Sequence, residues 1–378
     1  MLFWMHFFAA VMVPFYTDWG GLKLSQILFL NSWFMLWNFI LEVPTGTIAD
    51  FLGRKFSLAL GCVMAAGAAL LYVSQPNFYI FLAAEFVFAI AYTLHSGADE
   101  ALAYDSLKVI GAETTSKSVL SAMESFKLAG IIIATITGGF IASQFGPDTT
   151  MKAYAIPACI AFLLAMSLKE PPPENEIVEK KYYFKILRDG TAFFTSNKIL
   201  LILTLELSLT NAFAWGIIWL FQPLLTAAGL AIKYFGIVHA LSALGQIILL
   251  SNLQRVESWI GSKRKLLLIM AMTAGLAFIS LAFVKSIFAV AFAIIVSFTF
   301  SLPRIPIFSS YMNKFIPSDK RATILSLTSM LRTLAIVIIN PIIGFLADWS
   351  IFYTMMILGG LILFSTFFSR IEEKHLID

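Results

Sequence analysis

The stretch Gly46-Thr47-Ile48-Ala49-Asp50-Phe51-Leu52-Gly53-Arg54-Lys55 separates two long apolar runs, residues 24–45 and 56–73. Each run is long enough to cross a bilayer as a helix, whereas the stretch between them is too short to cross it again. Its two glycines let the backbone turn, and its three charged residues belong where lipid headgroups meet water. The two runs therefore form a helical hairpin with its turn at one membrane surface.

The composition extends this interpretation to the whole chain. Of its 378 residues, 59% are hydrophobic and only 13% are charged, and the mean hydropathy is +0.86. No soluble domain of this size keeps so few charges, so the class is a membrane protein with many spans. Cys62 and Cys159 lie inside apolar runs, where we expect packed thiols and no disulfide framework.

Twelve apolar spans follow, most of them about 18–27 residues long and able to cross the hydrocarbon core. They are residues 2–17, 24–48, 56–73, 78–105, 118–144, 151–168, 198–221, 232–254, 265–284, 286–312, 322–346 and 352–369. Apolar residues begin at Leu2 with no small-residue cleavage site after them, so the first run is interpreted as a membrane helix and not a signal peptide. The expected fold class is an all-α membrane protein with twelve transmembrane helices.

Lysine and arginine are unevenly divided between the connections. With both termini placed in the cytoplasm, the inside segments carry 19 of these residues and the outside loops carry four. Positive charge concentrates on the cytoplasmic side of membrane proteins, so we expect cytoplasmic termini in a cytoplasmic (inner) membrane. Three further cations, Lys127, Arg304 and Arg332, lie within spans.

One long connection divides the chain. Residues 1–168 form a first six-helix bundle, residues 169–197 a cytoplasmic central loop, and residues 198–378 a second bundle with a short cytoplasmic tail. In the loop, three prolines at 171–173 end the sixth span, the run from Glu174 to Lys181 is solvated, and residues 182–194 form an interfacial amphipathic stretch.

The two halves repeat each other. Gly21-Leu22 and Gly53 recur as Gly229-Leu230 and Gly261, and Gly139-Phe140 recurs as Gly344-Phe345. At the offset of 205 residues that relates Gly139 to Gly344, Lys127 falls on Arg332. Matching turns, glycines and cations favour duplication, so the two bundles are expected to be pseudo-symmetric.

Three motifs carry a family resemblance. The charged stretch follows Glu42-Val43-Pro44-Thr45, the inner end of the fourth span reads Ser96-Gly97-Ala98-Asp99-Glu100-Ala101-Leu102-Ala103-Tyr104-Asp105-Ser106-Leu107-Lys108, and Asp319-Lys320-Arg321-Ala322-Thr323 opens the eleventh. With the span count and the repeat, these motifs resemble the major facilitator superfamily, in particular its drug:proton antiporter-like branch in bacteria and archaea. The sequence departs from that branch at Ala134-Thr135-Ile136-Thr137-Gly138-Gly139, which keeps paired glycines but lacks the usual Gly-Pro.

The resemblance implies a gate between two bundles. Arg54 would pair with Asp105, and Asp50 would cap the start of the eleventh span near Thr323, where a helix dipole favours an anion. Together with Gly53 and Lys55, these residues would hold one state of a rocking-bundle transporter and separate as the inside opens.

Charged side chains inside spans need a partner, water or a function, because each costs about 3 kcal/mol to insert. Glu206 lies near mid-membrane in the seventh span and Glu85 at a similar depth in the fourth, so both are candidates for proton carriage or substrate contact; structural pairing is the alternative. Glu206 is the leading candidate, and Arg332, near the midplane of the eleventh span, could pair with it across the bundle.

The remaining candidates are cations and a histidine pair. Glu124 and Lys127 lie one helical turn apart and can pair with each other or line a cavity. Arg304, between Pro303 and Pro306, either bonds the freed backbone or lines the cavity. His95 and Asp99 share a helix face and, with His6 and His239, suggest a weaker alternative of metal transport.

The expected function is secondary active transport of a small organic compound by alternating access, with proton-coupled export implied by the resemblance. The alternative is a symporter or uniporter that imports a small organic anion, favoured by Lys127, Arg304, Arg332 and the missing Gly-Pro; a sensor or scaffold without transport is a third hypothesis. We find no enzyme motif, metal motif or cofactor site in the sequence, and expect lipid, proton and small-molecule partners, no nucleic acid, and a monomer.

Overall fold

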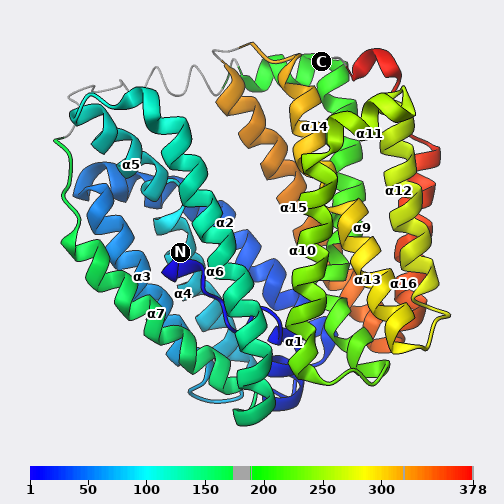
Figure 1. Ribbon diagram of the computed structural model, residues 1–378, viewed down its shortest axis with the longest axis horizontal. Coiled ribbons are helices and arrows are strands. Elements are labelled where there is room, and N and C mark those ends of the chain that lie inside the picture. The colour runs from blue at the N-terminus through cyan, green and yellow to red at the C-terminus, as the bar shows by residue number, and fades with distance from the viewer. Residues whose placement is uncertain (173–187, 189, 318–319, 377–378) are drawn as a thin grey trace. The chain divides into compact units, whose positions relative to one another are not determined.

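The computed structural model describes residues 1–172, 188, 190–317 and 320–376, apart from the side chains of Val43, Asp50 and Ala322. Every regular element within these residues is a helix (Figure 1). The first half contains η1 (Leu2–Trp4), α1 (Met12–Pro14), η2 (Phe15–Trp19), α2 (Leu24–Leu52), α3 (Arg54–Tyr72), α4 (Phe78–His95), α5 (Ala98–Val109), η3 (Glu113–Thr115), α6 (Ser116–Phe145) and α7 (Asp148–Ser167). The second contains α9 (Lys198–Ala227), η4 (Ile232–Tyr234), α10 (Phe235–Ser251), α11 (Leu253–Ile260), α12 (Lys263–Ser280), α13 (Ile287–Ser301), α14 (Arg304–Asn313), α15 (Arg321–Trp349), α16 (Ile351–Phe367) and η6 (Glu373–His375).

The chain forms two compact units: Met1–Glu174 with Leu230–Ala240, and Asn175–Gly229 with Leu241–Asp378. In the first unit α3 packs against α4 and α7, α2 packs against α4, and η4 packs against α6. In the second unit α9 packs against α13, α15 and α16, and α12 packs against α13 and α16. The run from Glu174 to Lys181 and most of the amphipathic stretch expected at 182–194 lie outside the described residues.

Nine segments of the described chain are helical, long and apolar enough to cross a membrane. They are Leu24–Glu42, Arg54–Tyr72, Phe78–Val109, Glu113–Phe145, Asp148–Ser167, Lys198–Ala227, Ile232–Ser251, Ile287–Asn313 and Thr323–Trp349. Two further expected spans are helices that fall just outside this group: α16 is 17 residues long, and α12 begins with three cations. The architecture therefore fits the expected twelve-helix fold, with the first span as the exception.

Residues 2–17 do not form the continuous helix expected from their hydropathy. They contain a 3₁₀ turn, isolated turns, a three-residue α-turn and the start of a π-helix. Phe3, Phe8, Ala10 and Val11 are buried within the first unit. The apolar character of this run is thus accounted for by packing inside the protein and not by a lipid-spanning helix.

The fourth and tenth spans are each broken once. Gly97, with φ +73°, separates α4 from α5, and Pro303 separates α13 from α14. A proline inside a helix removes one backbone hydrogen bond, and glycine adopts positive φ without a steric penalty. Pro303 therefore accounts for the break in the tenth span, and the matching break at Gly97 adds to the repeat between the halves.

Large apolar side chains cover much of the outer helix surfaces. Examples with most of their area exposed are Phe126, Ile156, Phe292 and Phe367. A lipid environment accepts such a surface, whereas water disfavours it.

Candidate functional site

The gate residues of the first unit meet as the resemblance implied. The Arg54 guanidinium forms an ion pair with the Asp105 carboxylate, joining the start of α3 to α5. This contact confirms the expected pairing, whereas its role in gating remains a prediction. The Asp50 side chain and Asp319 lie outside the described residues, so the expected cap of α15 is not addressed.

A second carboxylate completes the start of α3. Glu170, which follows α7, accepts the backbone N–H groups of Arg54 and Lys55, each at 2.7 Å. Gly53 has φ +95°, and a side chain there would meet this carboxylate at about 3.0 Å. Gly53 is therefore required by the backbone turn and by the approach of Glu170.

Glu85 is buried among aromatic side chains. The Tyr16 hydroxyl donates a 2.6 Å hydrogen bond to its carboxylate, and Tyr16 packs edge-on against Phe81 and Tyr72. Only 4% of Glu85 is exposed. The contacts favour structural pairing for this residue, since its known partner is a buried tyrosine and not another charge.

His95 and Asp99 lie close together at the break between α4 and α5, with Nε2 and Oδ2 3.7 Å apart. The Phe3 ring stacks on His95 at 3.9 Å between centroids, and His6 lies in the same aromatic cluster. Within the described residues no three histidine, cysteine or acidic side chains come together as a metal site. The metal-transport alternative therefore gains no support from these histidines.

Glu124 and Lys127 form the expected ion pair on α6, at 3.2 Å. The Lys127 ammonium also lies 4.3 Å from the centre of the Trp4 ring. Both side chains are partly exposed, so this pair contributes little to stability.

The second unit contains a buried ion pair between Glu206 of α9 and Arg304 of α14. Their closest N–O distance is 3.3 Å, and the side chains are only 9% and 5% exposed. The Ser369 hydroxyl, which follows α16, donates to the other carboxylate oxygen of Glu206. Both oxygens of this carboxylate are thus satisfied, one by a side chain of α14 and the other by a residue just after α16.

Arg332 is not the partner of Glu206. Its guanidinium donates to Ser329 Oγ, one turn earlier on α15, at 3.3 Å. The Glu206–Arg332 pair that the sequence allowed does not form, because the break at Pro303 starts α14 at Arg304 and brings this cation to α9.

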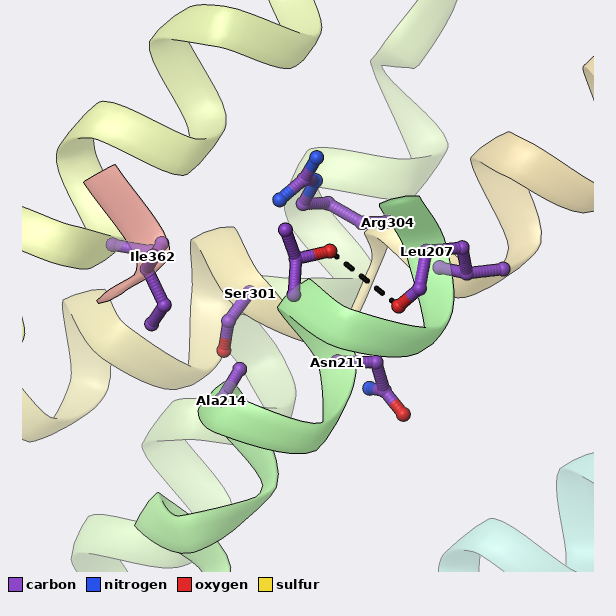
Figure 2. Close-up of a pocket in the computed structure, with 8 residues that line it drawn as sticks. Leu207, Asn211, Ala214, Ser301, Arg304 and Ile362 are labelled. Atoms are coloured by element: carbon purple, nitrogen blue, oxygen red, sulfur yellow. Dashed lines mark hydrogen bonds between the residues drawn. The ribbon is translucent and has the colours of Figure 1, made fainter. Parts of the chain in front are cut away.

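Two small cavities flank the ion pair, each about 10 Å³, close to the volume of one water molecule. Figure 2 shows the inner cavity around α9, lined by Leu207, Thr210, Asn211, Ala214, Ala274, Ser301, Arg304 and Ile362. The other cavity is lined by Glu206, Arg264, Leu267, Leu268, Thr366, Ser369 and Ile371. Arg304 thus lines a cavity inside the unit, and its partner Glu206 lines a second cavity beside the C-terminal segment.

Sequence reasoning did not single out Asn211, Ser301 or Ser369. These are common, uncharged residues, and hydropathy treats them as ordinary parts of a span or tail. Asn211 lies five residues after Glu206 on the same helix, about 1.4 turns further along and on another face, so its position did not by itself indicate a site.

The comparisons with known proteins agree with this architecture. The family described as Major Facilitator Superfamily matches residues 1–340. A mutant of the nucleoside transporter NupG superposes with a TM-score of 0.82 at 14% identity, covering 97% of this chain and 96% of that one. A D-xylose-proton symporter gives 0.75 at 14% identity over 98% and 95%, and a POT family transporter in complex with 5-aminolevulinic acid gives 0.73 at 14% over 100% and 95%. No curated protein matches the sequence.

Proposed function

The chain belongs to the major facilitator superfamily, and we propose that it is a proton-coupled secondary transporter that exports a small organic compound across the cytoplasmic membrane. Membrane transport follows from the family and the fold; proton coupling, export, the identity of the membrane and cytoplasmic termini are proposals. So are a monomeric state and the division into an N-terminal bundle (1–168), a loop (169–197) and a C-terminal bundle (198–378).

The Glu206–Arg304 pair is the observation that supports proton coupling. A buried ion pair survives only while both charges are present, because removing one leaves the other uncompensated in a medium that solvates it poorly. Protonation of Glu206 has this effect on Arg304 without any covalent change. The proton would thereby change the relative energies of two arrangements of the second unit, which is what coupling to alternating access requires.

The Arg54–Asp105 pair supports the proposed gate in the first unit. Both side chains are about a third exposed. Partial exposure keeps the pair weak enough to break during each cycle, since exposed ion pairs are worth at most about 1 kcal/mol. Asp50, Gly53 and Lys55 would complete this gate, as the resemblance implies.

Import of an organic anion is the second candidate. Once Glu206 is protonated, Arg304 is a buried cation that an anionic substrate group can neutralise, and Arg332 provides a further partly buried cation. Two proteins of similar fold are described as a nucleoside transporter and a D-xylose-proton symporter, so nucleosides and sugars are also reasonable substrates to test.

A flux experiment in proteoliposomes tests the proposal. Purified protein is first screened by thermal shift against nucleosides, sugars, organic acids and amphipathic drugs, since a bound ligand raises the melting temperature. The radiolabelled hit is then followed under imposed pH gradients of either sign. Proton-coupled export predicts that substrate moves against the proton flux; movement with it supports the importer, and indifference to the gradient removes proton coupling.

Glu206→Gln is the matched variant in this assay. Glutamine keeps the shape of the side chain and cannot carry the proton. We expect gradient-driven accumulation to disappear while binding and substrate exchange without a gradient persist. Unchanged accumulation in Glu206→Gln would transfer the proton to Glu85 or Glu124, or remove it from the mechanism.

A further inference from the structure

The cavity beside the C-terminal segment borders both a buried carboxylate and the surface of the second unit. Glu206, whose side chain is 9% exposed, lines it together with Ser369 and the exposed Arg264, the second residue of α12. Its volume of about 10 Å³ is enough for one water molecule. A water here has polar partners of both kinds, because a carboxylate and a hydroxyl accept hydrogen bonds and a guanidinium donates them. The cavity therefore suits a single bound water next to the Glu206 carboxylate.

The Ser369 hydroxyl is held so that its proton is directed at Glu206. It donates to Oε2 of Glu206, and its oxygen accepts the backbone N–H of Ile371 at 3.2 Å. A hydroxyl oxygen has two lone pairs, so one remains to accept from the cavity. Thr366 lines the same cavity, but its hydroxyl donates to the main-chain oxygen of Ile362 at 2.7 Å and not to the carboxylate. Ser369 is thus a donor to Glu206 and an acceptor towards the cavity.

Residues 369–376 form a fixed wall of the cavity. Ile371 lines the cavity and, like Leu376, is buried in the hydrophobic core of the second unit, with 3% and 2% of the two residues exposed. Glu373 accepts the backbone N–H groups of Lys263 and Arg264 at the start of α12. A wall held in this way keeps the space at the size of one water, which can pass protons but leaves no room for a hydrated metal ion.

We propose that Glu206 exchanges its proton with the aqueous phase through one water in this cavity, with Ser369 as the relay between them. A hydronium ion outside gives its proton to the cavity water, the water gives one proton to Ser369 Oγ, and Ser369 gives its hydroxyl proton to Glu206 Oε2. The water and Ser369 each gain one proton and lose one, so the net change is a proton on Glu206. The Arg264 guanidinium has donors only, so it turns the protons of the water towards Ser369. Glu206 is the carrier under the proposed function, on which this inference rests.

Hydrogen–deuterium exchange at the Glu206 carboxyl tests the relay, with deuterium oxide as the probe. At acidic pH the protonated carboxyl gives an infrared C=O band that Glu206→Gln lacks, and this band shifts when deuterium oxide replaces water. Ser369→Thr and Ser369→Val have the same shape, but only threonine keeps the hydroxyl. We expect exchange near the wild-type rate in Ser369→Thr and at least about tenfold slower exchange in Ser369→Val, as the loss of a hydrogen-bonded step predicts.

Thr366→Val is the control, because it removes the neighbouring hydroxyl at the same cavity and should leave the exchange rate unchanged. Equal rates in Ser369→Thr and Ser369→Val would overturn the relay. So would a spectrum in which Glu206→Gln removes no band, because Glu206 would then not take up a proton.

The second test detects the water itself and uses the wild-type protein, so it holds even if Ser369→Val does not fold. X-ray radiolysis converts bound water into hydroxyl radicals, which oxidise the nearest side chains, and mass spectrometry locates the oxidised residues. Ile371 and Leu376 are almost equally buried, but only Ile371 is among the residues that line the cavity. Ile371 should therefore be oxidised several-fold faster, whereas equal rates would mean a dry cavity and overturn the proposal.

Both tests run without a substrate or a proton gradient. If both give the expected results while Glu206→Gln leaves gradient-driven flux unchanged, the proposed coupling fails and the water route stands. If Ser369→Val exchanges as fast as Ser369→Thr while Glu206→Gln abolishes the coupling, the relay fails and the proposed function stands.

Discussion

Glu170 and Glu373 occupy equivalent positions in the two units of the chain. Glu170 follows α7 and accepts the backbone N–H groups of Arg54 and Lys55 at the start of α3. Glu373 follows α16 and accepts those of Lys263 and Arg264 at the start of α12. Carboxylates at helix N-termini satisfy unpaired donors and interact favourably with the helix dipole. The pairing ties the end of each unit to its own charged turn.

Glu373→Gln should destabilise the second unit. Glu373 also accepts from the Ser262 hydroxyl at 2.6 Å. Burial raises its pKa, but the Ser262 hydroxyl and the two backbone N–H groups outweigh it and hold the pKa below the ordinary value of 4.5. Glutamine keeps one acceptor and loses the charge, so we expect a loss of about 1 kcal/mol, as for other helix caps, seen as a melting temperature about 2–4 °C lower.

The same contact predicts a pH dependence. A carboxylate with a lowered folded-state pKa contributes its full stability above 4.5 and loses it as the pH falls through the lowered value. The difference in melting temperature between wild type and Glu373→Gln should therefore be constant near neutrality and shrink below pH 4.5. Glu372→Gln is the control, because that exposed carboxylate pairs with Lys374 and caps only the three-residue η6, not a long helix of the unit. If both substitutions lower the melting temperature equally, the change in net charge and not the contact at the start of α12 causes the loss of stability.

Arg54→Ala and Asp105→Asn should lower the transport rate and leave the melting temperature nearly unchanged. The pair is partly exposed, so it adds little to the stability of the unit, yet its loss shifts the balance between conformers. Asp50→Asn should act in the same direction if the role implied by the resemblance is right. The measurement is the initial rate of substrate flux beside ligand affinity; wild-type rates for Arg54→Ala would exclude the gate, and recovery in the exchanged pair Arg54→Asp with Asp105→Arg would support it.

Much of the fold could be predicted because hydropathy and charge act over whole spans. The hairpin at residues 46–55 appears as α2 and α3 around Gly53, and most expected spans agree with observed helices to within a few residues. Hydropathy could not show the irregular path of residues 2–17, because an apolar run has the same composition whether lipid or protein surrounds it. Phe3, stacked on His95 inside the first unit, belongs to the second case.

The site was less predictable than the fold. Sequence position placed Glu206 in a span, but its partner depends on which faces of α14 and α15 point towards α9. Arg304 of α14 reaches the Glu206 carboxylate, whereas Arg332 of α15 binds Ser329 on its own helix. Uncharged residues such as Asn211 and Ser369 carry no signal in composition. Their significance appears only once burial and hydrogen bonds are known.

Gly138→Ala should destabilise the first unit, whereas Gly67→Ala should not. A methyl group at Gly138 would collide with the main-chain oxygen of Phe7, but one at Gly67 meets no atom within 4 Å. Both glycines are inside helices, where alanine alone is favourable by about 1 kcal/mol. Thermal unfolding should thus show a loss of about 1–3 kcal/mol for Gly138→Ala, from overpacking against a backbone, and no loss or a small gain for Gly67→Ala. Equal stability of the two variants would mean that the segment around Phe7 moves aside at little cost.

Arg304→Gln and Arg332→Gln should differ strongly in their effect on stability, although sequence position made them similar candidates. Arg304→Gln leaves the Glu206 carboxylate buried without its counter-charge, a change that costs about 3–5 kcal/mol in other buried pairs. Arg332 donates to Ser329 and has no acidic partner among the described residues, so its loss should cost less than about 1 kcal/mol. The double variant Glu206→Gln with Arg304→Gln separates charge from shape: two neutral amides can hydrogen-bond to each other, and we expect most of the melting temperature lost in Arg304→Gln to return.

Affinity for the screened substrate is measured on the same samples. A neutral or cationic substrate predicts that Arg332→Gln spares affinity and that the double variant loses affinity only in part. Sharp loss of affinity in both single variants at unchanged stability would instead support the anion importer. Failure of the double variant to regain stability would show that Arg304 is held by its packing, including the contact with the Phe308 ring 5.3 Å away, and not by Glu206.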